Sequence, residues 1–217
     1  MEVPVGPAQH WAMKPNLVGR NASMILGLML ATVPGFSKTP VSDVRLTVRL
    51  LDYVNLPAGA RREVASTATR VLAQAGVAVE FVECFTDGVD SGTPACTAPL
   101  GPADLILRIF QPKFAPKGEL LGYAAMTSEG GAYITVFINP AQRKARVGSL
   151  DDGVFLGYAV AHEIGHLLLG ANSHSTSGIM RPAWRPVDEE WMAKGVLVFD
   201  ARQAKQMRSK LLAWFSQ

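Results

Sequence analysis

Three of the four histidines in this 217-residue chain lie in one short segment, at positions 162, 166 and 174. His162 and His166 are four residues apart in a stretch without proline. On a helix, both side chains would therefore lie on one face, about 6 Å apart along the axis. Two imidazoles placed in this way can bind one zinc ion, whose nitrogen ligands lie at about 2.0–2.1 Å. The spacing therefore predicts a metal-binding helix.

The residues around this pair predict a catalytic site for one Zn²⁺ ion. Glu163 directly follows the first histidine, the position from which a carboxylate acts as general base toward water in HExxH sites. Gly170 can end the helix in a left-handed conformation. The chain can then turn back and bring His174 to the metal as a third ligand. Three protein ligands and one open position are typical of catalytic zinc sites, whereas structural sites are closed.

His162, Glu163 and His166, followed by His174 and by Met180 in Gly-Ile-Met-Arg-Pro, resemble the metzincin clan of zinc endopeptidases. The motif of that clan is HExxHxxGxxH, followed by a tight turn that carries a methionine beneath the metal. By this resemblance Met180 is the Met-turn residue, a hydrophobic floor under the ligands. The local motif is specific, and the likeness extends over most of the chain from about residue 44 onward.

The spacing within the motif departs from the clan. The clan's glycine lies three residues after the second histidine and its third ligand lies six residues after. Here Gly170 lies four residues after His166, and His174 lies eight residues after. Asn172 occupies the strict third-ligand position, but an amide oxygen is a weak ligand for zinc. His174 is therefore the predicted third ligand, reached by a helix and loop two residues longer than in the clan.

The resemblance implies a secreted zinc-dependent endopeptidase that acts on a peptide or protein substrate. Glu163 would take a proton from the attacking water and deliver it to the leaving amine. In the clan an antiparallel edge strand bounds the cleft and pairs with extended substrate. Residues 121–126 would form this strand here and bind a peptide by strand addition.

Two alternatives stay open. In the first, Glu189 or Glu190 is the third ligand, as in glutamate-ligated zincins, although both residues also suit the acidic first turn of a helix. In the second, the chain is a zinc-binding envelope or interaction protein that hydrolyses nothing. Glu163 argues against the second alternative, because a purely structural metal site needs no base.

The remaining pattern predicts an α/β fold, and the resemblance to the metzincin clan implies that it is of the α+β, zincin-like kind. Alternating or continuous apolar runs indicate strands at 44–53, 77–85, 103–110, 120–127 and 132–138, and a helix at 57–75 joins the first two. Glycines at 130 and 131 indicate a hairpin, so we expect a mixed, mostly parallel twisted sheet with an antiparallel edge strand. The active-site helix begins near Gly153, residues 86–102 form a loop, and Asp188 and Asp200 begin helices of a small C-terminal subdomain.

Composition and length indicate one ordered globular domain. Hydrophobic residues make up 48% and charged residues 18% of the chain, as in folded proteins. We expect a single domain at 38–217, with subdomains at 38–170 and 171–217. The net charge of +3 is mild, and no dense basic run is present, so no nucleic-acid partner is expected.

The N-terminus resembles a targeting segment. Lys14 and Arg20 precede an apolar run at 24–33 and small residues through Ser37, the pattern of a secretory signal. We therefore predict a signal at 1–37 with its true start at Met13, export to the periplasm or outside the cell, and no stable membrane insertion after signal removal. The alternative is an uncleaved N-terminal anchor.

Cys84 and Cys96 are the two cysteines of the chain and flank a loop rich in Gly, Asp and Pro. In an exported protein such a pair is expected to form a disulfide.

Overall fold

The computed structural model describes residues 45–84, 92–112, 121–126, 131–138 and 150–216. By its internal contacts the chain divides into Met1–Lys38 and Thr39–Gln217, and every described residue belongs to the second unit. The predicted signal at 1–37, with its start at Met13, lies outside the described residues. Within the described ranges, no helix combines the length and the apolar character needed to cross a membrane.

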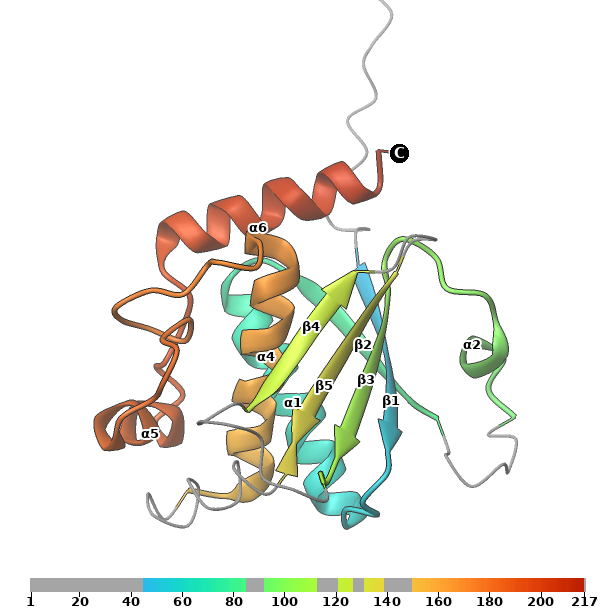
Figure 1. Ribbon diagram of the computed structural model, residues 1–217, viewed down its shortest axis with the longest axis horizontal. Coiled ribbons are helices and arrows are strands. Elements are labelled where there is room, and N and C mark those ends of the chain that lie inside the picture. Colours follow the sequence, from blue (N-terminus) through green and yellow to red (C-terminus); the bar gives the residue numbers. More distant parts are fainter. Residues whose placement is uncertain (1–44, 85–91, 113–120, 127–130, 139–149, 217) are drawn as a thin grey trace, which may run out of the picture. The chain divides into compact units, whose positions relative to one another are not determined.

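The centre of this unit is a five-stranded sheet in the order β2-β1-β3-β5-β4 (Figure 1). The strands are β1 (Arg45–Asp52), β2 (Ala78–Cys84), β3 (Asp104–Phe110), β4 (Gly122–Met126) and β5 (Ala132–Phe137). β1 runs parallel to β2 and β3, β3 runs parallel to β5, and β4 pairs antiparallel with β5. The predicted α/β fold with a mostly parallel sheet and an antiparallel edge strand is therefore confirmed.

The helices are α1 (Ala58–Gln74), α2 (Pro94–Thr97), α4 (Asp152–Leu169), α5 (Pro186–Ala193) and α6 (Ala201–Trp214). The prediction of a loop throughout 86–102 was wrong at α2, a single helical turn that begins with a proline. Proline fixes φ near the helical value and needs no hydrogen-bond partner in a first turn, so it starts a helix readily.

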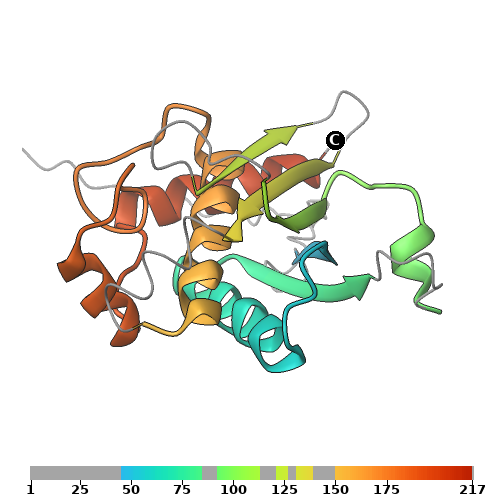
Figure 2. The ribbon, with the colours of Figure 1, turned by 60° about the horizontal axis from the view of Figure 1, so that its bottom comes forward.

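The hydrophobic core lies between the sheet and the helix pair α1 and α4, which pack against each other and cover one face of the sheet (Figure 2). The alternating apolar residues of the central strands point into this layer and are fully or almost fully buried: Leu46, Val48, Leu50, Leu105, Leu107, Ile109, Ile134 and Val136. Helix α4 is apolar around most of its circumference. A helix of this kind is stable only inside a core, which fixes the position of the histidines it carries.

Both ends of α4 are set by local chemistry. The Asp151 side chain accepts hydrogen bonds from the backbone N–H groups of Gly153 and Val154 at 2.8 and 3.2 Å and thereby caps the first turn. Gly170 follows the last turn with φ at +103°, and its N–H bonds the carbonyl of His166. Glycine adopts this conformation without strain, so the chain leaves the helix four residues after the second histidine.

Cys84, at the end of β2, and Cys96, in α2, form a disulfide with a Cα–Cα distance of 5.7 Å. The disulfide expected from the sequence is confirmed. It attaches the α2 segment to the β2 edge of the sheet, the edge opposite to β4.

Candidate metal centre

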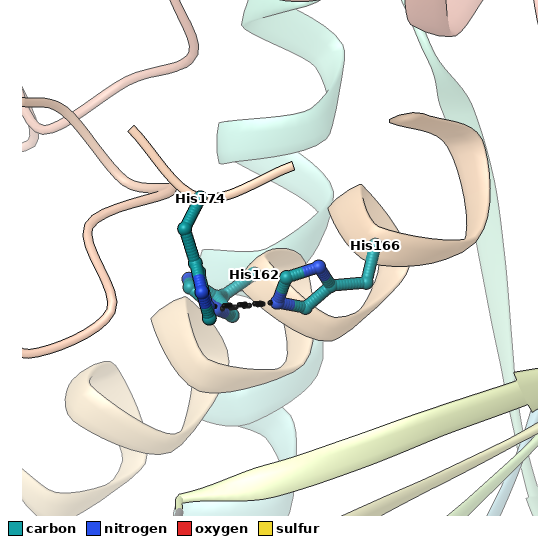
Figure 3. A group of neighbouring side chains, drawn as sticks. All are labelled: His162, His166 and His174. Carbon is teal, nitrogen blue, oxygen red and sulfur yellow. Dashed lines mark hydrogen bonds between the residues drawn. The ribbon is translucent and has the colours of Figure 1, made fainter. Parts of the chain in front are cut away.

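The three histidines converge on one point (Figure 3). His162 and His166 project from α4, and His174 comes from the loop that follows the helix. The Nε2 atom of His166 lies 3.0 Å from Nε2 of His162 and 3.1 Å from Nε2 of His174. The three side chains thus offer ligand atoms that all lie within 4.8 Å of one another and could hold a metal ion.

In two of these rings, the second nitrogen, Nδ1, lies within hydrogen-bond distance of another residue. His162 Nδ1 lies 2.8 Å from the carbonyl oxygen of Ile179, and His166 Nδ1 lies 3.0 Å from the Ser173 hydroxyl. A carbonyl oxygen only accepts, so His162 must donate from Nδ1 and keep a lone pair on Nε2. Partners of this kind fix the tautomer and the ring orientation of metal-binding histidines.

Burial keeps the two helical histidines neutral. The pKa of His162 is lowered to about 4, mainly by desolvation and in smaller part by the neighbouring His166 and His174. Desolvation also lowers the pKa of His166, assisted by His174. At neutral pH these rings therefore carry the lone pairs that a metal ligand requires.

The donor set fits a borderline-soft cation. Two nitrogens at about 2.0–2.1 Å from one tetrahedral ion lie roughly 3.3–3.4 Å apart, close to the Nε2 separations that His166 makes with its two neighbours. Imidazole suits zinc, copper, iron and nickel, so the three nitrogens by themselves do not select one metal.

Glu163 lies beside the three rings and lines the same cavity. Its side chain is buried, and this desolvation raises its pKa to about 7. The carboxylate packs under β4, because a Cβ added at Gly122 would lie 3.0 Å from Glu163 Oε1 and 2.5 Å from the Thr135 carbonyl oxygen. The absence of a side chain at Gly122 therefore lets the edge strand approach the carboxylate closely.

Met180 lies beneath the ligand-bearing helix and is fully buried. A Cβ added at Gly165, between the two helical histidines, would lie 2.6 Å from Met180 Sδ and 2.8 Å from the Phe199 ring. Gly165 thus allows the methionine to reach the back of the helix. Ile179, the residue before Met180, supplies the carbonyl that holds His162.

The cavity has a volume of about 260 Å³. Its walls are β4 on one side and the chain after the histidine loop on the other. The described residues that line it are Leu121, Gly122, Tyr123, Ala124, Ala159, His162, Glu163, His166, Ala171, His174, Arg181, Pro182 and Trp184. The antiparallel strand at 121–126, expected to bound the cleft, therefore does so.

The alternative ligands lie elsewhere. Among the described residues, the group of His, Cys, Asp and Glu side chains that could share one ion consists of the three histidines and includes neither Glu189 nor Glu190. Both glutamates belong to α5. Asn172 is exposed and does not line the cavity.

Comparison with protein-family models and with curated protein sequences found no match to this chain. The sequence did not predict Ser173 and the Ile179 carbonyl, which contact the histidine rings, or Trp184 and Arg181, which line the cavity. Their neighbours along the chain carry no spacing pattern that would have indicated them.

Proposed function

We propose that this protein is a zinc-dependent endopeptidase of metzincin type that hydrolyses peptide bonds in protein or peptide substrates. The observation that carries the proposal is the convergence of three Nε2 atoms next to the buried carboxyl of Glu163, in a cavity walled by an edge strand. Three neutral imidazoles leave the positive charge of a zinc ion uncompensated, which suits a catalytic rather than a structural site.

The division of roles follows from the geometry. His162, His166 and His174 would hold the ion. When bound, zinc supplies Lewis acidity, which polarises a carbonyl and makes water more acidic. Glu163 would accept the proton of the attacking water and pass it to the leaving amine. In the metal-free site burial raises the pKa of this carboxyl to about 7, and a bound cation would favour its ionised form, which can accept a proton.

The edge strand supports a peptide as substrate. Among the strands that the structure describes, β4 lies at the end of the sheet and pairs on one side with β5. An extended peptide could therefore add to the outer edge of β4 and place a backbone carbonyl over the three histidines.

The disulfide supports export. Disulfides persist in oxidising compartments and are rare in the cytosol, and Cys84 and Cys96 are paired. We therefore propose a periplasmic or extracellular location, in agreement with the signal predicted at 1–37.

The substitution Glu163→Gln tests the function. The variant should bind zinc as the unaltered protein does but lose cleavage of unfolded casein or a peptide library, by roughly 100-fold or more. Glu190→Gln, on the exposed side of α5, is the matched control and should keep activity. If the zinc-loaded parent protein cleaves nothing, the protein is a zinc-binding protein without hydrolytic function. If Glu163→Gln retains activity, the proposed base is wrong.

A further inference from the structure

Arg181 brings a positive charge into the cleft. It directly follows Met180 and lines the cavity together with His162 and Glu163. Among the described residues that line this cavity, it is the one arginine or lysine, and its guanidinium group is a cation. Its side chain is 17% exposed, so it is held in place rather than free in solvent.

One edge of the guanidinium is anchored by Asp188. Arg181 Nε lies 3.3 Å from Asp188 Oδ2, and the Asp188 side chain is fully buried in the first turn of α5. The same carboxylate oxygen lies 3.5 Å from Nε of Arg185, whose side chain is mostly exposed and does not line the cavity. Asp188 therefore positions two guanidinium groups, of which Arg181 is the one at the cleft.

The other edge of the guanidinium carries unused donors. In the described part of the chain, neither terminal nitrogen of Arg181 has a hydrogen-bond partner, and its one ion pair runs through Nε. The buried polar atoms without a partner include Arg181 Nε but neither terminal nitrogen, so the terminal nitrogens are not fully buried, and Arg181 lines the cavity. Guanidinium groups match the two oxygens of a carboxylate in a bidentate arrangement.

We propose that Arg181 binds a carboxylate of the bound peptide and gives the enzyme a preference for negatively charged substrates. This inference rests on the proposed peptidase function. The carboxylate can come from an Asp or Glu side chain or from the C-terminus of the substrate, since both present the same pair of oxygens. Asp188 holds the arginine in position, and a cation bound by the three histidines would add to the attraction for an anionic peptide.

Three peptides of one neutral sequence separate these sources: one with an amidated C-terminus, one amidated with a single internal Glu, and one with a free C-terminal carboxylate. The zinc-loaded protein should cleave at least one of the two carboxylate peptides with a kcat/KM roughly 10- to 100-fold above that of the neutral peptide. The peptide that shows the gain identifies the source. If all three are cleaved equally well, the proposal is wrong.

Variants of Arg181 and Arg185 show which arginine causes the preference for carboxylate peptides. In Arg181→Ala and Arg181→Gln, the ratio of kcat/KM between carboxylate and neutral peptides should fall to about one. The glutamine removes the charge but keeps a polar side chain and more of its bulk than alanine does, so it serves if the alanine variant folds poorly. Arg185→Ala is the matched control, because it loses a contact with the same Asp188 but leaves the cleft unchanged. A preference that survives Arg181→Gln, or that Arg185→Ala abolishes equally, would overturn the assignment.

Binding measured without turnover separates this proposal from the proposed function. Calorimetry with zinc-loaded Glu163→Gln and the same three peptides should show tighter binding of the preferred carboxylate peptide, and loss of that preference in Glu163→Gln/Arg181→Gln. If no peptide is cleaved but the selective binding is present, the peptidase function alone is wrong. If cleavage occurs without carboxylate selectivity, the role of Arg181 alone is wrong.

Discussion

His162 Nδ1 lies 2.8 Å from the carbonyl oxygen of Ile179, the residue that precedes Met180. The same oxygen accepts a hydrogen bond from the Trp184 indole at 2.9 Å. One backbone carbonyl therefore connects the His162 ring on α4 to the turn that carries Met180 and to an aromatic side chain of the cleft wall. The turn that carries Met180 thus orients the His162 ring through its backbone, in addition to filling space beside Gly165.

His174→Ala should weaken zinc binding by more than about 100-fold, since even outer partners of metal ligands contribute 10- to 100-fold. His174 supplies one of the three converging Nε2 atoms. Asn172→Ala, in the same loop but with an exposed side chain outside the cavity, should leave zinc affinity unchanged. Titration against a chromophoric chelator measures both variants. Unaltered affinity in His174→Ala would mean that the ion is held by other residues.

Ser173→Ala should lower zinc affinity by about tenfold, as expected for loss of a partner that orients a metal ligand. The Ser173 hydroxyl lies 3.0 Å from His166 Nδ1. Ser177→Ala, an exposed serine of the same loop, is the control and should bind zinc normally. The chelator titration applies here too, and equal affinities for the two serine variants would show that the hydroxyl does not orient the ring.

The helices and strands, and the position of two histidines on one helix face, could be predicted because their sequence signals are local. His162 and His166 share a helix face whenever the segment is helical. The alternation of apolar residues in β1 indicates a strand with one buried face. The antiparallel pairing of β4 and β5 agrees with the hairpin predicted from the glycine pair before β5.

The contacts that the histidine rings and the cleft receive from loop residues could not be predicted, because they depend on how the loops pack against α4. The Ile179 carbonyl has no sequence signature, since every residue has a carbonyl group. Ser173 is one of several polar residues in its loop, and only the path of the chain after Gly170 brings its hydroxyl to His166. Arg181 is placed in the cleft by Asp188, seven residues further along on α5.

Gly165→Ala should destabilise the protein by about 1 kcal/mol or more, because overpacking a buried site costs roughly 1–3 kcal/mol and exceeds the gain in helix propensity. The new methyl group would meet Met180 Sδ and the Phe199 ring, both buried. Gly59→Ala in α1 meets nothing within 4 Å and should be neutral or stabilising by up to about 1 kcal/mol. Urea unfolding of both variants measures the difference.

A double-mutant cycle identifies the contact responsible. Gly165→Ala should be less destabilising in a Met180→Ala background, where the sulfur atom that it would meet is missing. If the two substitutions act additively, the strain in Gly165→Ala arises at Phe199 instead.

Removal of the disulfide should lower the free energy of unfolding by about 3 kcal/mol, according to the chain-entropy estimate for a loop of this length. The double variant Cys84→Ser/Cys96→Ser should nevertheless bind zinc normally, because the disulfide is attached to β2 and the cavity is bounded by β4 at the opposite edge of the sheet. Chemical unfolding and zinc titration test the two parts separately. Lost zinc affinity would show that the sheet transmits the change to the site.

Glu163 and His162 should have opposite effects on the pH dependence of stability in the metal-free protein. The pKa of Glu163 is raised from 4.5 to about 7 by burial. The folded state therefore binds more protons than the unfolded state between these values, and stability falls as pH rises through this window. The pKa of His162 is lowered from 6.5 to about 4. Here the unfolded state binds more protons, so stability falls as pH drops from 6.5 toward 4.

Glu163→Gln separates the two effects, because it removes the carboxyl and keeps the histidines. Relative to the parent protein, the variant should gain stability progressively from pH 4.5 to about 7, by up to about 3 kcal/mol at 1.36 kcal/mol per pKa unit. Urea unfolding in the presence of a chelator, at intervals across this range, measures the difference. With zinc bound, the adjacent cation favours the ionised carboxylate, so the same comparison should give a smaller gain. A difference that does not change with pH in the metal-free protein would mean that Glu163 is hydrated and not buried beneath β4.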